Sequence, residues 1–165
     1  MTKVVAEFRK GLEDLGLLTK NKYLKTKEEY AKKFGFIPSE GDVLWGLSNQ
    51  LLLEAMEKEN RHKMKMIYFS QALFLHKSGK DCFKLLQETG KCELREYQQS
   101  GVVEKVEILT RGKKSCPDCQ KLAGKIFTIE EAFKRVPIPV KECSYKINPE
   151  APTGWCRCCY VEVIE

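Results

Sequence analysis

Apolar residues recur at helical spacing through the first part of the chain. The first predicted helix follows Thr2, a residue type that caps helix N-termini, and ends at Gly16. Residues 19–25 are mostly polar and predict a loop. Thr26-Lys27-Glu28-Glu29 then has the form of a capping box, so a short helix is expected from there to Gly35.

Three longer amphipathic helices are expected next. The first starts near Ser39, and its apolar face is expected to carry Val43, Leu44, Leu47, Leu51, Ala55 and Met56. Asn60 interrupts the pattern, the second helix runs to about Gly79, and the third closes near Gly101. Short connections between successive helices favour antiparallel neighbours, which predicts a helical bundle.

The pattern changes after Gly101. Residues 102–109 are rich in β-branched side chains and predict a strand, and residues 160–164 alternate as a final strand. Between them, Thr128 opens a second capping box, whose helix is expected to run to about Arg135 and to end before Pro137. The sequence therefore predicts an α+β fold, divided into residues 1–100 and 101–165.

Composition adds little about partners. The chain has 165 residues, of which 42% are hydrophobic and 32% charged, a balance typical of soluble globular proteins. It contains no apolar run near the roughly 20 residues that a membrane helix needs. The start of the chain lacks a secretory apolar region, so we expect a cytoplasmic protein that does not bind membranes.

The net charge of +6 allows a nucleic-acid partner, with a basic excess at Lys20, Lys22, Lys25, Lys27, Lys32 and Lys33. Interleaved acidic residues favour an ordinary solvated helix surface there.

Cysteine carries the clearest chemical signal. In a reducing compartment, cysteines are more often metal ligands, redox groups or core residues than disulfides. Six of the eight lie in the last fifty residues, where Cys116-Pro117-Asp118-Cys119 forms a C-x2-C pair. Zinc takes four such thiolates at about 2.3 Å. We expect one structural Zn²⁺ ion on Cys116, Cys119, Cys156 and either Cys143 or Cys158, with Cys159 a weaker alternative.

A zinc ion would supply folding free energy to a segment with few large apolar side chains. The predicted architecture is thus an α-helical bundle over residues 1–100 and a small zinc-stabilised α/β module over residues 101–165. The two cysteines outside the module, Cys82 and Cys92, fall in a predicted helix and are expected in the core.

Two other interpretations of the cysteines stay open. They are buried or reactive thiols without metal, or the strand and C-x2-C motif begin a glutaredoxin-like thiol oxidoreductase. Against the second, Gly124 follows too soon for the long helix of that fold, and the cysteines near Cys156 go unused. The only histidines, His62 and His76, lie in the helical part, which argues against a catalytic zinc site such as that of a hydrolase. No motif favours an enzyme or predicts a small-molecule substrate.

Several short motifs in the last third come in a fixed order: Val106 to Leu109, Cys116-Pro117-Asp118-Cys119, Leu122 to Phe127, Pro137-Ile138-Pro139 and Cys156-Arg157-Cys158. In this order residues 102–164 resemble the cysteine-containing C-terminal domain of the phage Mu F-like, or head morphogenesis, family. The family usually has His-Pro before Cys-Arg-Cys, where this chain has Gly154-Trp155. The resemblance implies that Cys143 takes the histidine's place as ligand, and a role in phage-derived particle assembly.

Together these observations predict a non-enzymatic, zinc-containing binding or assembly protein. Its helices would serve as an interaction platform, and its partner would be a protein or a nucleic acid.

Overall fold

The computed structural model describes residues 2–164. Helices dominate these residues, and a small antiparallel sheet follows them. In chain order the elements are α1 (Lys3–Asp14), α2 (Lys20–Phe34), α3 (Glu40–Glu57), α4 (Arg61–Lys77), α5 (Phe83–Ser100), β1 (Lys105–Leu109), the 3-10 helix η1 (Gly112–Lys114), α6 (Pro117–Gln120), β2 (Ile126–Thr128), α7 (Ile129–Arg135) and β3 (Cys159–Val163). The α+β class predicted from the sequence is confirmed.

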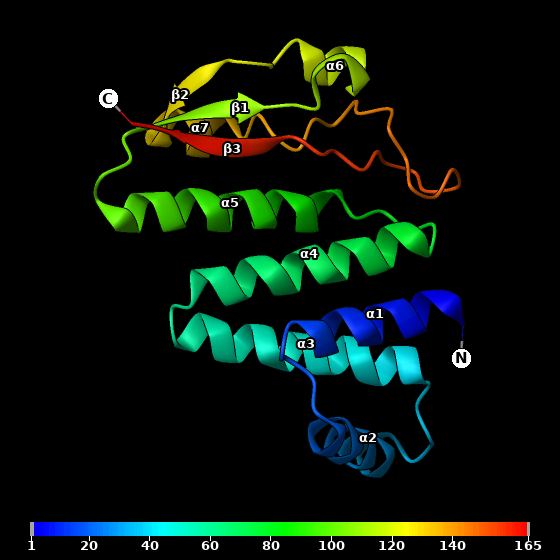
Figure 1. Ribbon diagram of the computed structural model, residues 1–165. Coiled ribbons are helices and arrows are strands. Elements are labelled where there is room, and N and C mark those ends of the chain that lie inside the picture. The colour runs from blue at the N-terminus through cyan, green and yellow to red at the C-terminus, as the bar shows by residue number, and fades with distance from the viewer. Residues whose placement is uncertain (1, 165) are drawn as a thin grey trace.

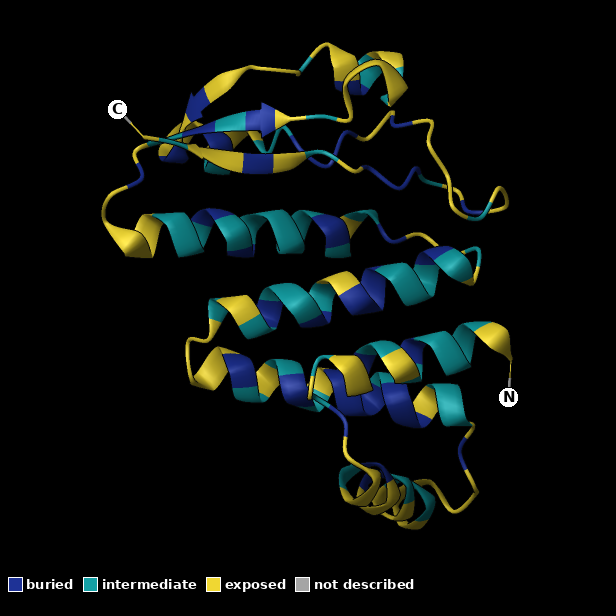
Figure 2. Cartoon of the chain, viewed as in Figure 1, coloured by how far each residue is buried: buried dark blue, intermediate teal, exposed yellow. Residues whose placement is uncertain are grey.

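The elements stack in layers (Figure 1). The sheet and α7 form one end, with α5 lying beneath them and α4 beneath α5. Helices α1 and α3 form the next layer, and α2 lies at the far end and contacts α3. Figure 2 shows buried residues, in dark blue, in each of these layers, interspersed with intermediate and exposed residues.

Local capping explains most helix boundaries. The side chains of Thr2, Ser39 and Asn60 each accept a hydrogen bond from a backbone N–H in the first turn of α1, α3 and α4. Gly35 and Gly101 end α2 and α5 in the left-handed conformation, which glycine adopts without strain. These are starts and stops that the sequence predicts.

One helix starts earlier than predicted. Residues 20–25 form the first turns of α2 rather than a loop, with Thr19 as the cap, and Thr26 is buried inside the helix rather than at its start. The prediction is wrong because Tyr23 and Thr26 are buried although the turn is polar overall. Met56 of α3 is 47% exposed, whereas the other residues expected on the apolar face are buried: Val43, Leu44, Leu47, Leu51 and Ala55.

The sheet has the order β2-β1-β3, and both pairings are antiparallel. Strand β2 pairs Phe127 with Val106 and was not predicted, since three residues are too few for an alternating pattern. Helix α7 begins with the predicted capping box of Thr128 and Glu131. The buried side chains here, the module core, are Leu94, Val103, Val106, Ile108, Cys119, Phe127, Ile129, Ala132, Ile138, Val140, Cys143, Cys156 and Tyr160.

Helix α5 belongs to more than one core. Leu94 lies in the module core, whereas Cys92 packs in the helical core with Phe8, Leu12, Leu18, Tyr23, Val43, Leu44, Leu47, Leu51, Ala55, Met64 and Ile67. A third group, the junction cluster, joins α4 and α5 to the final third of the chain through Ala72, Cys82, Leu86 and Trp155. A division of the chain into two domains near residue 101 stays a prediction. Among the described residues, none of the helices combines the length and apolarity needed to cross a membrane.

Candidate metal centre

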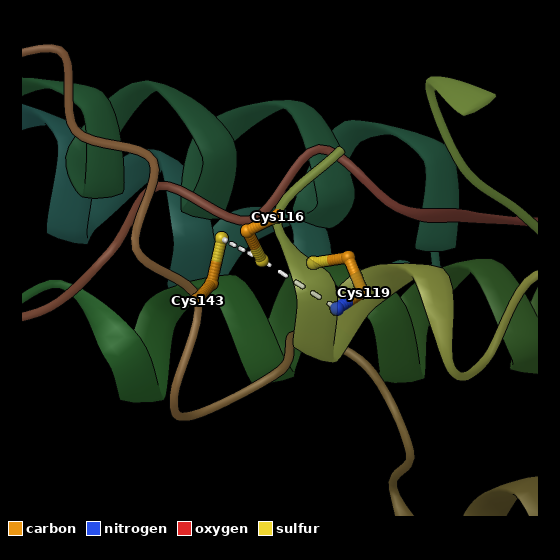
Figure 3. Close-up of side chains that lie close together, drawn as sticks. All are labelled: Cys116, Cys119 and Cys143. Carbon is orange, nitrogen blue, oxygen red and sulfur yellow. Dashed lines mark hydrogen bonds between the residues drawn. The ribbon is translucent and has the colours of Figure 1, made fainter. Parts of the chain in front are cut away.

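The first part of the site is a tight turn built by the C-x2-C motif. Cys116 is the N-cap of α6, and Pro117 occupies the first helical position, where its missing N–H and fixed φ cost nothing. The turn aims the N–H of Cys119 at Cys116 Sγ, with 3.5 Å between the two atoms (Figure 3). The motif therefore presents two sulfurs on one side of a short helix.

A loop between α7 and β3 supplies the third thiol. Cys143 follows Val140, whose carbonyl accepts the Cys143 N–H at 3.2 Å. The Sγ atoms of Cys116 and Cys143 lie 3.9 Å apart, and a dashed line joins the two neighbouring side chains in Figure 3. Gly154 packs directly on the Cys143 carbonyl, so a Cβ at position 154 would overlap the carbonyl oxygen.

The segment that enters β3 supplies two more thiols. Cys156 Sγ lies 3.9 Å from Cys119 Sγ. Cys119, Cys156 and Cys158 form one triad, and Cys116, Cys119 and Cys143 form another, and within each triad all sulfurs lie within 4.8 Å of one another. The structure thus brings all five predicted candidate ligands together, with Cys119 common to both triads.

Hydrogen bonds lower the pKa of two of the five thiols. Burial opposes ionisation of Cys116, but N–H groups of Cys119 and Ser144 donate to its sulfur and lower its pKa to about 7. The Cys158 thiol and the N–H of Val140 likewise lower the pKa of Cys156 to about 6. Burial raises the pKa of Cys143 to about 12. The pKa is therefore lowered for two thiols of the cluster and raised for a neighbouring one, and the thiolate is the form that binds a metal.

Cationic side chains surround the thiols. A cavity of about 30 Å³ lies against Cys116, Cys119, Cys143 and Cys158, and its other walls include Arg111, Lys114 and Arg157. The Arg157 guanidinium is held 3.6 Å from the centre of the Tyr145 ring. Positive charges in this position offset the negative charge that several thiolates concentrate on one metal.

His76 holds the cysteine loop against the helical layers. It is fully buried on α4, and its Nε2 accepts the N–H of Ile147 at 3.0 Å and that of Asn148 at 3.4 Å. Nδ1 therefore carries the proton and faces Cys82 Sγ at 3.7 Å. The sequence gives His76 no such role, because it shows only a single histidine on an amphipathic helix.

The remaining cysteines lie outside the cluster. As predicted, Cys82 and Cys92 both lie in the core: Cys82 is 1% exposed in the junction cluster, and Cys92 is 0% exposed in the helical core. Cys82 is the N-cap residue of α5 rather than part of the helix. Cys159 is exposed and belongs to neither triad. All eight cysteines are free thiols in the structure.

Comparison with known proteins identifies no relative. No family model matches the chain, and neither does a curated protein or a solved structure. The phage Mu F-like resemblance therefore stays a prediction from the motifs alone, and the chemistry of the thiol cluster carries the functional argument.

Proposed function

We propose that this chain is a non-enzymatic binding or assembly protein whose last third is held together by one structural zinc ion. The observation that carries the proposal is the convergence of five thiols from three separate segments. Residues 136–158 contain no helix or strand, yet they supply three of these thiols. A loop of this length inside a compact fold needs another source of order, and a metal cross-link provides one.

The ligands that best suit zinc are Cys116, Cys119, Cys143 and Cys156. A tetrahedral site with Zn–S bonds of about 2.3 Å has sulfurs about 3.8 Å apart. The Cys116–Cys143 and Cys119–Cys156 pairs, each 3.9 Å apart, have close to this spacing. The four sulfurs do not form one group within 4.8 Å, so a zinc ion would draw the two pairs together. Four sulfur ligands leave no open position for a substrate, which is typical of structural zinc rather than catalytic zinc.

The helical layers would provide the interaction surface. At the end of α2 and in the loop that follows it, Phe34, Phe36 and Ile37 are 52%, 61% and 78% exposed, a concentration of apolar surface far from the thiols. The lysines of α2 adjoin it. The apolar group favours a protein partner, and the lysines would also suit a nucleic acid. Either partner would be met in the cytoplasm.

The test is metal content combined with thiol reactivity. Protein purified without added metal should contain about one zinc per chain, and four thiols should become reactive only after chelation. Cys116→Ser should lose the zinc and unfold the module, whereas the matched Cys159→Ser variant should keep both. A chain free of metal in which Cys116 and Cys119 cycle between dithiol and disulfide would contradict the proposal.

That contrary result would support the second candidate, a thiol oxidoreductase. The lowered pKa of Cys116, at the start of a helix, is the observation in its favour. The four residues of α6 are the observation against it. An assembly role like that of the phage family stays a third proposal, which neighbouring genes for portal or capsid proteins would support.

A further inference from the structure

The proposed zinc site leaves one thiol of the cluster without a metal bond. Cys158 lies within 4.8 Å of Cys119 and Cys156, and only four sulfurs can surround a zinc ion. Its thiol donates a hydrogen bond to Cys156 and is half-buried, so it belongs to the cluster rather than to the surface. A fifth sulfur at this distance changes which metals the cluster can hold.

The five sulfurs are arranged as two triangles that share a corner. Cys116, Cys119 and Cys143 form the first, and Cys119, Cys156 and Cys158 form the second. A metal at the centre of three sulfurs, with bonds of about 2.3 Å, requires sulfurs about 4 Å apart. One edge of each triangle, Cys116–Cys143 and Cys119–Cys156, already measures 3.9 Å.

Three thiolates around one ion is an arrangement that copper(I) accepts and that zinc seldom does. Copper(I) is a soft, filled-shell ion, and thiolates are the ligands that select it. We propose that the five-thiol cluster is also a binding site for two copper(I) ions, one in each triangle, with Cys119 bridging them. The proposal concerns the same thiols as the zinc centre but does not require zinc to bind.

Charge and burial both suit such a site. Five thiolates and two monovalent cations leave three negative charges, compared with two for zinc on four thiolates. The cations Arg111, Lys114 and Arg157 stand beside the sulfurs. Cys119, Cys143 and Cys156 are 3%, 5% and 8% exposed, so the ions would be shielded from water. Binding converts five thiols to thiolates and releases five protons to solvent, and the second bond of the bridging Cys119 sulfur uses another of its lone pairs. Copper stays in the +1 state, so no electron acceptor is needed.

The test is an anaerobic titration of the metal-free full chain with copper(I) against a chromogenic copper(I) chelator. The wild type should withdraw two ions per chain from the chelator, and the shielded cluster should emit red light under ultraviolet excitation. Cys158→Ser removes a corner of one triangle only and should withdraw one ion with little emission. Cys159→Ser, which changes the adjacent exposed thiol, should still withdraw two.

Uptake of one ion or none by the wild type would overturn the proposal, and so would uptake of two by Cys158→Ser. The zinc content of Cys158→Ser is measured in parallel and should stay near one per chain, which shows that the variant folds. If Cys158→Ser loses zinc, the copper titration is repeated on Cys158→Ala. The number of copper ions that this variant and the wild type withdraw then decides whether the proposal holds. Absence of zinc from the wild type contradicts the proposed function, whereas absence of a second copper contradicts only this inference.

Discussion

At the scale of single residues, one glycine controls where a candidate ligand lies. Gly154 lies outside the helices and strands and packs against the backbone of Cys143, a candidate ligand of the cluster. A Cβ at this position would overlap the carbonyl oxygen of Cys143 and lie 2.6 Å from its carbon. Because the obstacle is backbone, no side-chain rotation can relieve the overlap.

We therefore predict that Gly154→Ala displaces Cys143 and weakens metal binding. The expected loss of stability is about 3 kcal/mol, the upper part of the range for overpacked sites. Zinc content and the midpoint of urea unfolding measure it. Gly11→Ala is the matched control, since a Cβ at Gly11 meets nothing within 4 Å, and it should be neutral or stabilising by up to about 1 kcal/mol. Equal behaviour of the two variants would contradict the steric argument.

At the scale of elements, α4 and the cysteine loop are joined through a neutral histidine. Burial lowers the pKa of His76 below its ordinary value of 6.5, and the positive charge of Lys146 lowers it further. Protonation at Nε2 would break the hydrogen bonds from Ile147 and Asn148, so the folded state binds this proton less readily than the unfolded state.

The sign of the pH dependence follows. The contribution of His76 is fully present above pH 6.5 and is lost as the pH falls below that value toward the lowered pKa. Wild-type protein should therefore lose more free energy of unfolding between pH 7.5 and 5.5 than His76→Gln, which keeps an acceptor but does not titrate. Both proteins contain the same thiols, so their difference isolates the histidine. Parallel pH profiles would show that His76 is not the titrating group.

The same elements show what the sequence reveals and what it does not. The caps at Thr2, Ser39, Asn60 and Thr128 are local signals, and each starts a helix in the structure. The sequence does not predict the start of α2, because the residues buried there are buried by packing on α3. The lysine-rich first turns carry no helical pattern of apolar residues. Strand β2 exists because β1 offers it an edge, a tertiary cause.

The candidate site divides in the same way. Cysteine is chemically specific, so the sequence predicts all five thiols of the cluster as candidate ligands, but it does not decide among Cys143, Cys158 and Cys159. Spacing does not show that Cys119 is common to two triads, because that depends on how the loop carrying Cys143 returns. His76 and Gly154 support the site from residues with ordinary sequence surroundings, and only the fold reveals them.

At the scale of the whole molecule, the two tryptophans report on different parts. Trp155 precedes the candidate ligand Cys156 in the chain and packs in the junction cluster, with its ring centre 5.4 Å from those of Phe69 and His76. Trp45 packs in the helical layers, 6.0 Å from Phe74. The proposed metal orders the surroundings of Trp155 and not those of Trp45. The fluorescence of the two tryptophans should therefore respond differently to chelation of the metal.

We predict that chelation shifts the fluorescence of Trp45→Phe, which retains Trp155, to longer wavelength as that side chain meets water. Trp155→Phe, which retains Trp45, should show no shift. Re-addition of zinc should reverse the change. A shift in both variants would mean that the helical layers also depend on the metal, with α5 transmitting the loss of order from one core to the other.

The strand order has a consequence for how the chain is made. Strand β1 is central, but its partner β3 lies more than fifty residues later, with Lys105 paired to Val163. While a ribosome synthesises the intervening segment, one hydrogen-bonding edge of β1 stays unpaired, and open edges invite pairing with other chains. The nascent protein is thus most prone to aggregate after α5 has folded and before β3 emerges, the interval in which chaperones would protect it.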